Sequence, residues 1–207
     1  PELESSNYTE SIEIYTRKIS NAPHNIDNYL KRGYSYHLLG SYKNAIKDFD
    51  KSIELSPDDG NSYLLRGESS HQIGDFENAL IDFNRALKIN PDHMAVYMHR
   101  AITKQSLEKY EESEMDWTKL IEYKNDFYFA YAGRAEARRD SGKYEEAISD
   151  CDVLILNSER LESAYNIRGY CKSMFGQLDE SISDYLSGYD VSETLGLLYN
   201  AGRSYER

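Results

Sequence analysis

The chain has 207 residues, of which 40% are hydrophobic and 29% are charged, so it holds enough apolar side chains for a packed core and wholesale disorder is not expected. Its 36 Asp and Glu outnumber its 24 Lys and Arg, and the net charge of −12 argues against a nucleic-acid partner, which usually meets a basic stripe. No run of about 18 apolar residues predicts a transmembrane helix, and the polar start at Pro1 is not a signal peptide. The start without an initiator Met suggests a piece of a longer protein.

Two cysteines, Cys151 and Cys171, lack the spacing of metal ligands and are too few for a disulfide framework. We interpret them as reduced core residues, which is compatible with a cytoplasmic protein. No phosphate-binding loop, nucleophile–base arrangement or paired-carboxylate setting stands out in the sequence. We therefore expect neither an enzyme nor a cofactor.

A 34-residue repeat organises the chain. Arg followed by Gly or Ala recurs at this spacing, at Arg32, Arg66, Arg100, Arg134 and Arg168. In chain order the period predicts the second helix of a leading partial repeat over 1–25, then full repeats over 26–59, 60–93, 94–127, 128–161 and 162–194, and finally the first helix of a truncated sixth repeat over 195–207. Residues 1–207 are thus expected to form a single array.

Each full repeat predicts two amphipathic helices joined by a turn. Position 4 is always Tyr, positions 17 and 24 are mostly aromatic, and positions 8 and 20 are small. Position 15 is Gly in four repeats, which suits the left-handed residue that ends a helix, and Glu108 in the third. Position 32 is Pro57 and Pro91 in the first two repeats, where proline stops the helix. Because one repeat cannot bury these faces alone, stacking of neighbours supplies the stability.

This pattern resembles the tetratricopeptide repeat, a 34-residue helix-turn-helix with small residues at positions 8 and 20, aromatics at 4, 17 and 24, and Pro at 32. The resemblance covers nearly the whole chain. It implies an all-α fold, a right-handed α-solenoid in which first helices line a concave groove and second helices form the convex side. Members of the family mostly bind peptides or partner helices in that groove.

Two charged columns run through the repeats. Position 7, commonly apolar in this family, is Arg in all five full repeats, and position 23 is Asp in all five. The partial repeats lose both columns together, with Ile14 at position 23 and Ala201 at position 7. Pairing within a repeat leaves no charge orphaned, so we predict structural ion pairs instead of an anion-binding groove: Arg32–Asp48, Arg66–Asp82, Arg100–Asp116, Arg134–Asp150 and Arg168–Asp184.

Positions 2, 5, 9 and 12 are expected to face the groove. In the middle repeats they combine apolar side chains with polar and charged ones, a mixture that suits an extended peptide or an amphipathic helix. The candidate partner-binding residues are Leu64, Glu68, His71, Met98, Ile102, Gln105, Phe129, Glu136 and Arg139. The excess negative charge falls mainly on second helices, where a solvated surface is its simplest interpretation.

A cluster of four aromatic residues begins at Phe127, and the repeat assigns a place to each. Tyr131 is the position-4 core residue. Phe127 and Tyr128 lie at the junction between repeats and are expected to brace the next helix near Trp117. Phe129, at position 2, has no structural role in the repeat and is expected to face the groove beside the apolar residues of the preceding repeat.

Two more specific sites are not supported by the sequence. His37 and His71 share position 12, but no third ligand accompanies them, so we predict polar groove residues and no metal site. Some members of the family clamp a C-terminal carboxylate with Lys, Arg and Asn, and none of these matches at the corresponding positions here: Leu30, Tyr34, Leu65, Ala95 and His99.

Together these features predict a non-catalytic scaffold or adaptor that binds a protein or peptide ligand, with no nucleic acid and no membrane. Two alternatives stay open. One is a regulatory or substrate-recruiting segment of a larger multidomain enzyme. The other is a structural spacer that self-associates through its open array ends.

Overall fold

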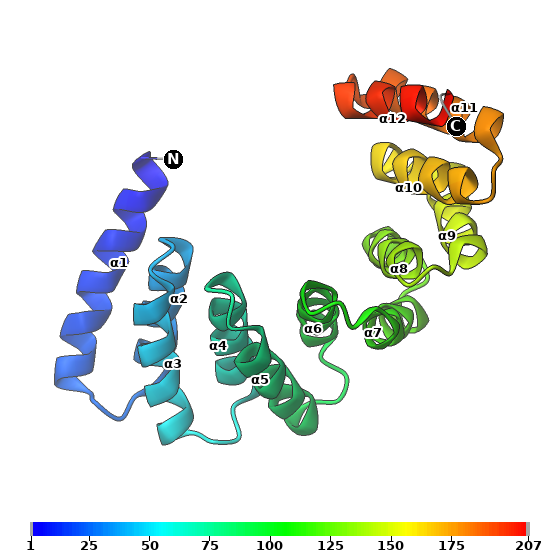
Figure 1. Ribbon diagram of the computed structural model, residues 1–207. Helices are drawn as coiled ribbons and strands as arrows, with labels where there is room; N and C mark the ends of the chain where they lie inside the picture. The colour runs from blue at the N-terminus through cyan, green and yellow to red at the C-terminus, as the bar shows by residue number, and fades with distance from the viewer. Residues whose placement is uncertain (1, 206–207) are drawn as a thin grey trace. The chain divides into compact units, whose positions relative to one another are not determined.

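The computed structural model describes residues 2–205, with side chains described from residue 7 onward, as helices joined by short turns (Figure 1). In chain order the helices are α1 (Glu2–Asn21), α2 (Ile26–Leu38), α3 (Tyr42–Leu55), α4 (Gly60–Gln72), α5 (Phe76–Ile89), α6 (Met94–Ser106), α7 (Tyr110–Tyr123), α8 (Tyr128–Asp140), α9 (Tyr144–Leu156), α10 (Leu161–Met174), α11 (Leu178–Ser192) and α12 (Leu195–Tyr205). The predicted all-α solenoid of stacked helices is confirmed. None of these described helices is long and apolar enough to cross a membrane.

The helices group into two compact units, residues 1–103 and residues 104–207, which we call the N-terminal unit and the C-terminal unit. The boundary between them falls inside α6. Within the N-terminal unit, α1 packs on α2, α2 on α3, α3 on α4 and α4 on α5. Within the C-terminal unit, each helix from α7 to α12 packs on the next in the same way. Neighbours in sequence are therefore neighbours in space, as a solenoid requires.

Glycine at position 8 lets the two helices of a repeat approach closely. A Cβ on Gly67 would lie 2.7 Å from Cε1 of Phe83, and a Cβ on Gly33 would lie 2.7 Å from Cε1 of Phe49. Both phenylalanine rings are completely buried. The missing side chain on the first helix thus makes room for the aromatic ring of the second helix, which explains why both columns recur together.

The main core of the C-terminal unit surrounds Leu154, Ile167 and the two cysteines. Cys151 and Cys171 are free thiols and completely buried, as predicted from the sequence. Burial raises the pKa of both thiols, that of Cys171 to about 12, so each remains neutral at physiological pH. They behave as small apolar side chains in this core.

The turn between paired helices uses a left-handed residue. Gly40, Gly74, Gly142 and Gly176 occupy it with φ between 72° and 81°. Glu108 takes the same place in the third repeat with φ of 57°. A residue with a Cβ pays about 1–2 kcal/mol in this conformation, so the turn at Glu108 is strained relative to the other four.

The predicted ion pairs within a repeat are present inside both units. The Nη2–Oδ1 distances are 2.7 Å for Arg32–Asp48, 2.6 Å for Arg66–Asp82, 2.7 Å for Arg134–Asp150 and 2.5 Å for Arg168–Asp184. The remaining predicted pair, Arg100 and Asp116, has one residue in each unit. All four measured pairs join a first helix to the second helix of the same repeat.

The Nη1 atom of each of these arginines donates a hydrogen bond to a side chain of the preceding repeat. The sequence interpretation missed this contact. Arg66 Nη1 lies 2.6 Å from Asp50 Oδ1, and Arg168 Nη1 lies 2.6 Å from Asp152 Oδ1. The acceptor is a neutral side chain elsewhere, in the pairs Arg32–Thr16, Arg100–Asn84 and Arg134–Thr118. These acceptors all occupy position 25. The recurrence of short side chains with an oxygen atom at that position is the sequence feature that could have predicted the contact. One arginine therefore ties together two consecutive second helices.

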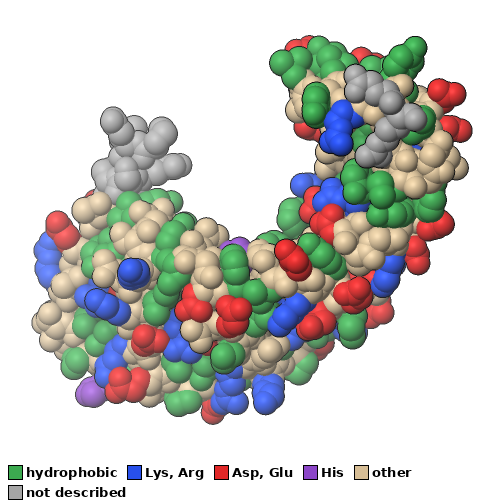
Figure 2. All heavy atoms as spheres, viewed as in Figure 1, with side chains coloured by type: hydrophobic (Ala, Val, Ile, Leu, Met, Phe, Trp, Pro, Cys, Tyr) green, Lys and Arg blue, Asp and Glu red, His purple; other side chains and the backbone are tan. Residues whose placement is uncertain are grey.

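Acidic side chains gather along the edge formed by α9 and α11 in the C-terminal unit (Figure 2). Both helices begin with acidic residues, Glu145 and Glu146 in α9 and Asp179 and Glu180 in α11. Negative charge in the first turn favours a helix because it opposes the positive end of the helix dipole. Part of the chain's net charge thus has a structural explanation.

Candidate functional site

The groove candidates of the N-terminal unit are held in a polar network. Glu68 Oε1 lies 2.9 Å from His99 Nε2, which joins α4 to α6. His71 Nδ1 lies 2.9 Å from Thr103 Oγ1, and His37 Nδ1 lies 2.9 Å from Ser69 Oγ. Position 12 of one repeat therefore contacts position 10 of the next.

The surroundings of both bridging histidines disfavour their protonated form. The Thr103 hydroxyl donates to the carbonyl of His99, so it accepts the Nδ1–H of His71. Burial lowers the pKa of His37 and of His71. The described residues contain no group of three or more His, Cys, Asp or Glu that could hold a metal ion. These histidines act here as hydrogen-bonding links between repeats.

One predicted groove residue of this unit is wrong. Leu64 is only 8% exposed and belongs to the hydrophobic core around Phe83 and Val96. Position 5 of α4 therefore points toward the interior, where an apolar side chain is stabilised by removal from water. Met98 and Ile102 are half-buried on α6.

In the C-terminal unit, Phe129 lies in an aromatic cluster. Its ring centroid is 5.7 Å from that of Trp117 and 6.1 Å from that of Phe127. The expectation that Phe129 lacks a structural role is therefore wrong, although 37% of it remains exposed. The Trp117 indole N–H donates to Gln105 Oε1 at 3.0 Å, so the predicted groove residue Gln105 also has a structural contact. An aromatic ring that is held on one side and exposed on the other is a suitable apolar anchor.

The two charged candidates of α8 differ in their partners. Arg139 forms two hydrogen bonds with its neighbour Asp140, at 2.7 and 3.1 Å. Its guanidinium also lies 6.0 Å from the ring centroid of Tyr170. Glu136 accepts no hydrogen bond from the described residues, and burial raises the pKa of its carboxyl. A half-buried carboxylate without a donor is a binding group for a cationic side chain.

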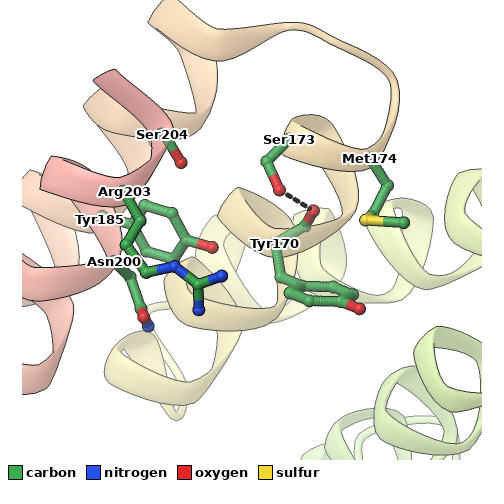
Figure 3. A pocket seen from close by; sticks show the side chains of 7 residues that line it. All are labelled: Tyr170, Ser173, Met174, Tyr185, Asn200, Arg203 and Ser204. Carbon is green, nitrogen blue, oxygen red and sulfur yellow. Dashed lines mark hydrogen bonds between the residues drawn. The ribbon is translucent and has the colours of Figure 1, made fainter. Parts of the chain in front are cut away.

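A pocket of about 280 Å³ opens between α10, α11 and α12 (Figure 3). Tyr185 and Ser204 are buried at its base, and Tyr170 and Met174 are exposed at its rim. Arg203 projects from α12 with its guanidinium toward this space. It forms no ion pair with the described residues. The pocket thus combines an aromatic wall with one available cation.

The sequence interpretation missed Tyr170 and Arg203. Both residues occupy position 9, as Glu136 does in the fourth repeat. Following position 9 into the fifth and sixth repeats would have found them. First helices of the C-terminal unit therefore present an acidic, an aromatic and a basic side chain in succession.

Comparison with family models finds tetratricopeptide repeats in part of the chain. Two tetratricopeptide-repeat family models match consecutive segments, residues 27–59 and residues 60–93. Residues 27–93 therefore match tetratricopeptide repeats, and the rest of the chain has no family match in this comparison. No curated protein sequence gives a significant match.

Solved structures share the fold of this chain at low sequence identity. YrrB, described as a TPR protein with an unusual peptide-binding site, is 15% identical with a TM-score of 0.79, covering 93% of this chain and 99% of its own. A crystal structure of MamA is 22% identical with a TM-score of 0.67, covering 70% of this chain and 85% of its own. MamA from Desulfovibrio magneticus RS-1 is 14% identical with a TM-score of 0.76, covering 81% and 95%. At these identities the likeness establishes the fold alone.

Proposed function

We infer that the first helices of the C-terminal unit bind a short extended peptide. The observation that carries this proposal is the succession of Glu136, Tyr170 and Arg203 at position 9 of α8, α10 and α12. A basic side chain of the ligand pairs with Glu136, an apolar side chain packs on Tyr170 and Met174, and an acidic group pairs with Arg203. Phe129 supplies a second apolar anchor near the start of α8.

The chemistry of each contact supports this ligand. Glu136 has a half-buried carboxylate that accepts no hydrogen bond from the described residues and lies within the electrostatic influence of Arg139 and Arg160, so its oxygens are available to a cation of the ligand. Arg203 lies beside a pocket of about 280 Å³, large enough for one side chain or chain terminus and too small for a helix. An extended peptide places successive side chains on opposite faces, which lets alternate residues reach successive repeats.

The experiment is a selection of short linear peptides from a displayed library on the 207-residue chain. Enriched peptides should carry one basic and one acidic residue on either side of an apolar or aromatic one. Arg203→Glu should replace the preferred acidic residue by a basic one, and Glu136→Lys should do the reverse at the other end. Arg85→Glu, an exposed change on the second helix α5, is the matched control and should leave the preference unchanged.

The proposal is overturned if no peptide is enriched over an unrelated helical protein. It is also overturned if neither charge reversal alters the selected peptides. The same peptides can be titrated against Phe129→Ala, where loss of an apolar anchor should weaken binding by about tenfold or more.

A further inference from the structure

A pocket of about 520 Å³ opens between α3, α4 and α5 of the N-terminal unit. Asp82 is only 3% exposed and lies at its base, where Arg66 contacts the carboxylates of Asp82 and Asp50 at 2.6 Å each. Three isoleucines form its apolar wall: Ile46, Ile73 and Ile81. The volume falls within the range of about 300–1,000 Å³ that is typical of ligand sites.

Other repeats of this chain fill the corresponding space with a cation. In the last three full repeats, position 11 is a long basic side chain that reaches the aspartate at position 23 of the same repeat. The distances between the charged atoms are 2.9 Å for Lys104–Asp116, 2.8 Å for Arg138–Asp150 and 2.8 Å for Lys172–Asp184. The side chain at position 11 thus normally brings a second positive charge to this aspartate.

In the second repeat, position 11 is Ser70, which is too short to do this. Ser70 lines the pocket and is only 5% exposed, and its hydroxyl forms no hydrogen bond with the described residues. Arg66 is the one cation that pairs with Asp82 in the part of the chain that the structure describes. Burial raises the pKa of the Asp82 carboxyl, and the Asp50 carboxylate acts in the same direction. A buried hydroxyl without a partner and a carboxylate that lacks its second cation therefore face one space.

The fifth repeat shows the same arrangement with the cation in place. Arg168 contacts one aspartate of its own repeat and one of the preceding repeat, as Arg66 does. Position 21 of the preceding repeat is Ile148 there and Ile46 beside the pocket. The main difference at the centre of the two sites is Lys172, whose place the pocket leaves open. The pocket thus has the lining of a lysine site.

The lining also favours lysine over arginine. In the fourth repeat Arg138 contacts two carboxylates, that of Asp150 and that of Glu114 at position 21. Ile46 holds position 21 beside the pocket and offers no second carboxylate. Ile81 is 63% exposed and extends the apolar wall outward. A lysine side chain carries one compact charge on a flexible aliphatic stem, which matches one carboxylate and an apolar wall.

Two basic residues at the opening restrict what can enter. Lys43 and Lys47 line the pocket, are exposed, and form no ion pair with the described residues. They would repel a ligand that carries several positive charges, such as a polyamine. They would attract an acidic group that lies next to a single lysine. The occupant is therefore a segment of a protein with one lysine and an adjacent acidic residue.

We propose that this pocket binds a single lysine side chain of a partner protein, with an acidic residue beside that lysine. The ammonium group takes the place of the missing cation of position 11, where it donates to the Asp82 carboxylate and the Ser70 hydroxyl. The aliphatic stem packs on the isoleucines, and the acidic neighbour meets the lysines at the opening. The site shares no residue with the position-9 peptide site, so either proposal can fail without the other.

The test is an NMR titration of the ¹⁵N-labelled 207-residue chain with a blocked dipeptide, acetyl-Lys-Glu-amide. The dipeptide should shift the amide signals around Ser70 and Ile81 in a saturable manner. Acetyl-norleucine-Glu-amide has no ammonium group and should bind about tenfold more weakly or less, the contribution of a hydrogen bond to a charged group. Equal binding of the two dipeptides overturns the proposal, and so does tighter binding of spermidine, which would make the pocket a polyamine site.

Variants at the pocket complete the test. Ser70→Lys supplies the cation from within the chain, as in the fifth repeat, and should weaken binding of the dipeptide by more than about tenfold. Gln72→Lys adds the same charge at an exposed site on the same helix and should bind as the wild type does. Ile81→Lys alters an exposed residue, so it should keep the thermal stability of the wild type while its charge repels the ligand. Undiminished binding by Ser70→Lys or by Ile81→Lys overturns the proposal.

Discussion

Arg66 donates two parallel hydrogen bonds to Asp82, from Nε to Oδ2 at 2.9 Å and from Nη2 to Oδ1 at 2.6 Å. Its remaining nitrogen donates to Asp50 of the preceding repeat at 2.6 Å. The bidentate geometry fixes both the distance and the rotation of the first helix against the second helix. The adjacent Asp82 and Asp50 carboxylates raise the pKa of the guanidinium, so the arginine is always charged.

Asp82→Ala should lower the free energy of unfolding by about 3 kcal/mol, because it leaves the Arg66 guanidinium with only its contact to Asp50. The measurement is urea unfolding followed by circular dichroism. Asp58→Ala is the matched control, since that carboxylate is exposed and its 3.4 Å contact with Arg85 is a surface pair. Equal stability of the two variants would refute a structural role for the arginine column.

Gly67→Ala should destabilise the protein by about 1–3 kcal/mol, because the new methyl group overlaps Phe83 in a packed core. Gly202→Ala is the control at the same repeat position. Its methyl group enters open space on α12, so it should be neutral or stabilising by up to about 1 kcal/mol through helix propensity. Thermal unfolding at low protein concentration distinguishes these opposite signs, and equal shifts would show that position 8 does not control helix approach.

The repeat period made the helices, the turns and the ion pairs predictable from sequence, because each feature recurs in several columns at once. Position 5 was harder to assign, since whether Leu64 faces solvent depends on the packing angle between helices. Phe129 was misjudged for a related reason. Its contact with Trp117 joins two repeats, and a column-by-column comparison within one repeat does not reveal such contacts. Arg203 lies in the partial repeat 195–207, outside the middle repeats from which the groove candidates come.

Glu108→Gly should stabilise the protein by about 1 kcal/mol, because glycine adopts the left-handed conformation at this turn without a steric cost. The other four turns already have glycine there. Lys47→Gly is the control, since it places glycine at an exposed site inside α3 and should cost about 1 kcal/mol. Urea midpoints that move the same way for both variants would contradict strain at Glu108.

The stability of the protein should fall as the pH drops below about 6.5, the ordinary pKa of histidine. Burial lowers the pKa of His37 and His71, so the unfolded chain takes up protons at these sites before the folded chain does. Their contribution to stability is complete above that pH and is lost as the pH falls through the lower pKa values of the folded state.

Denaturant unfolding between about pH 7 and about pH 5 measures this slope. The double variant His37→Gln, His71→Gln should lose stability at neutral pH, because Gln replaces two fitted hydrogen-bonding rings, and should show a shallower decline toward acid pH. The exposed His24→Gln is the matched control and should keep the wild-type slope. A double variant with the same slope as the wild type would show that acid destabilisation arises elsewhere, because removing both buried imidazoles removes the proton uptake that distinguishes their two states.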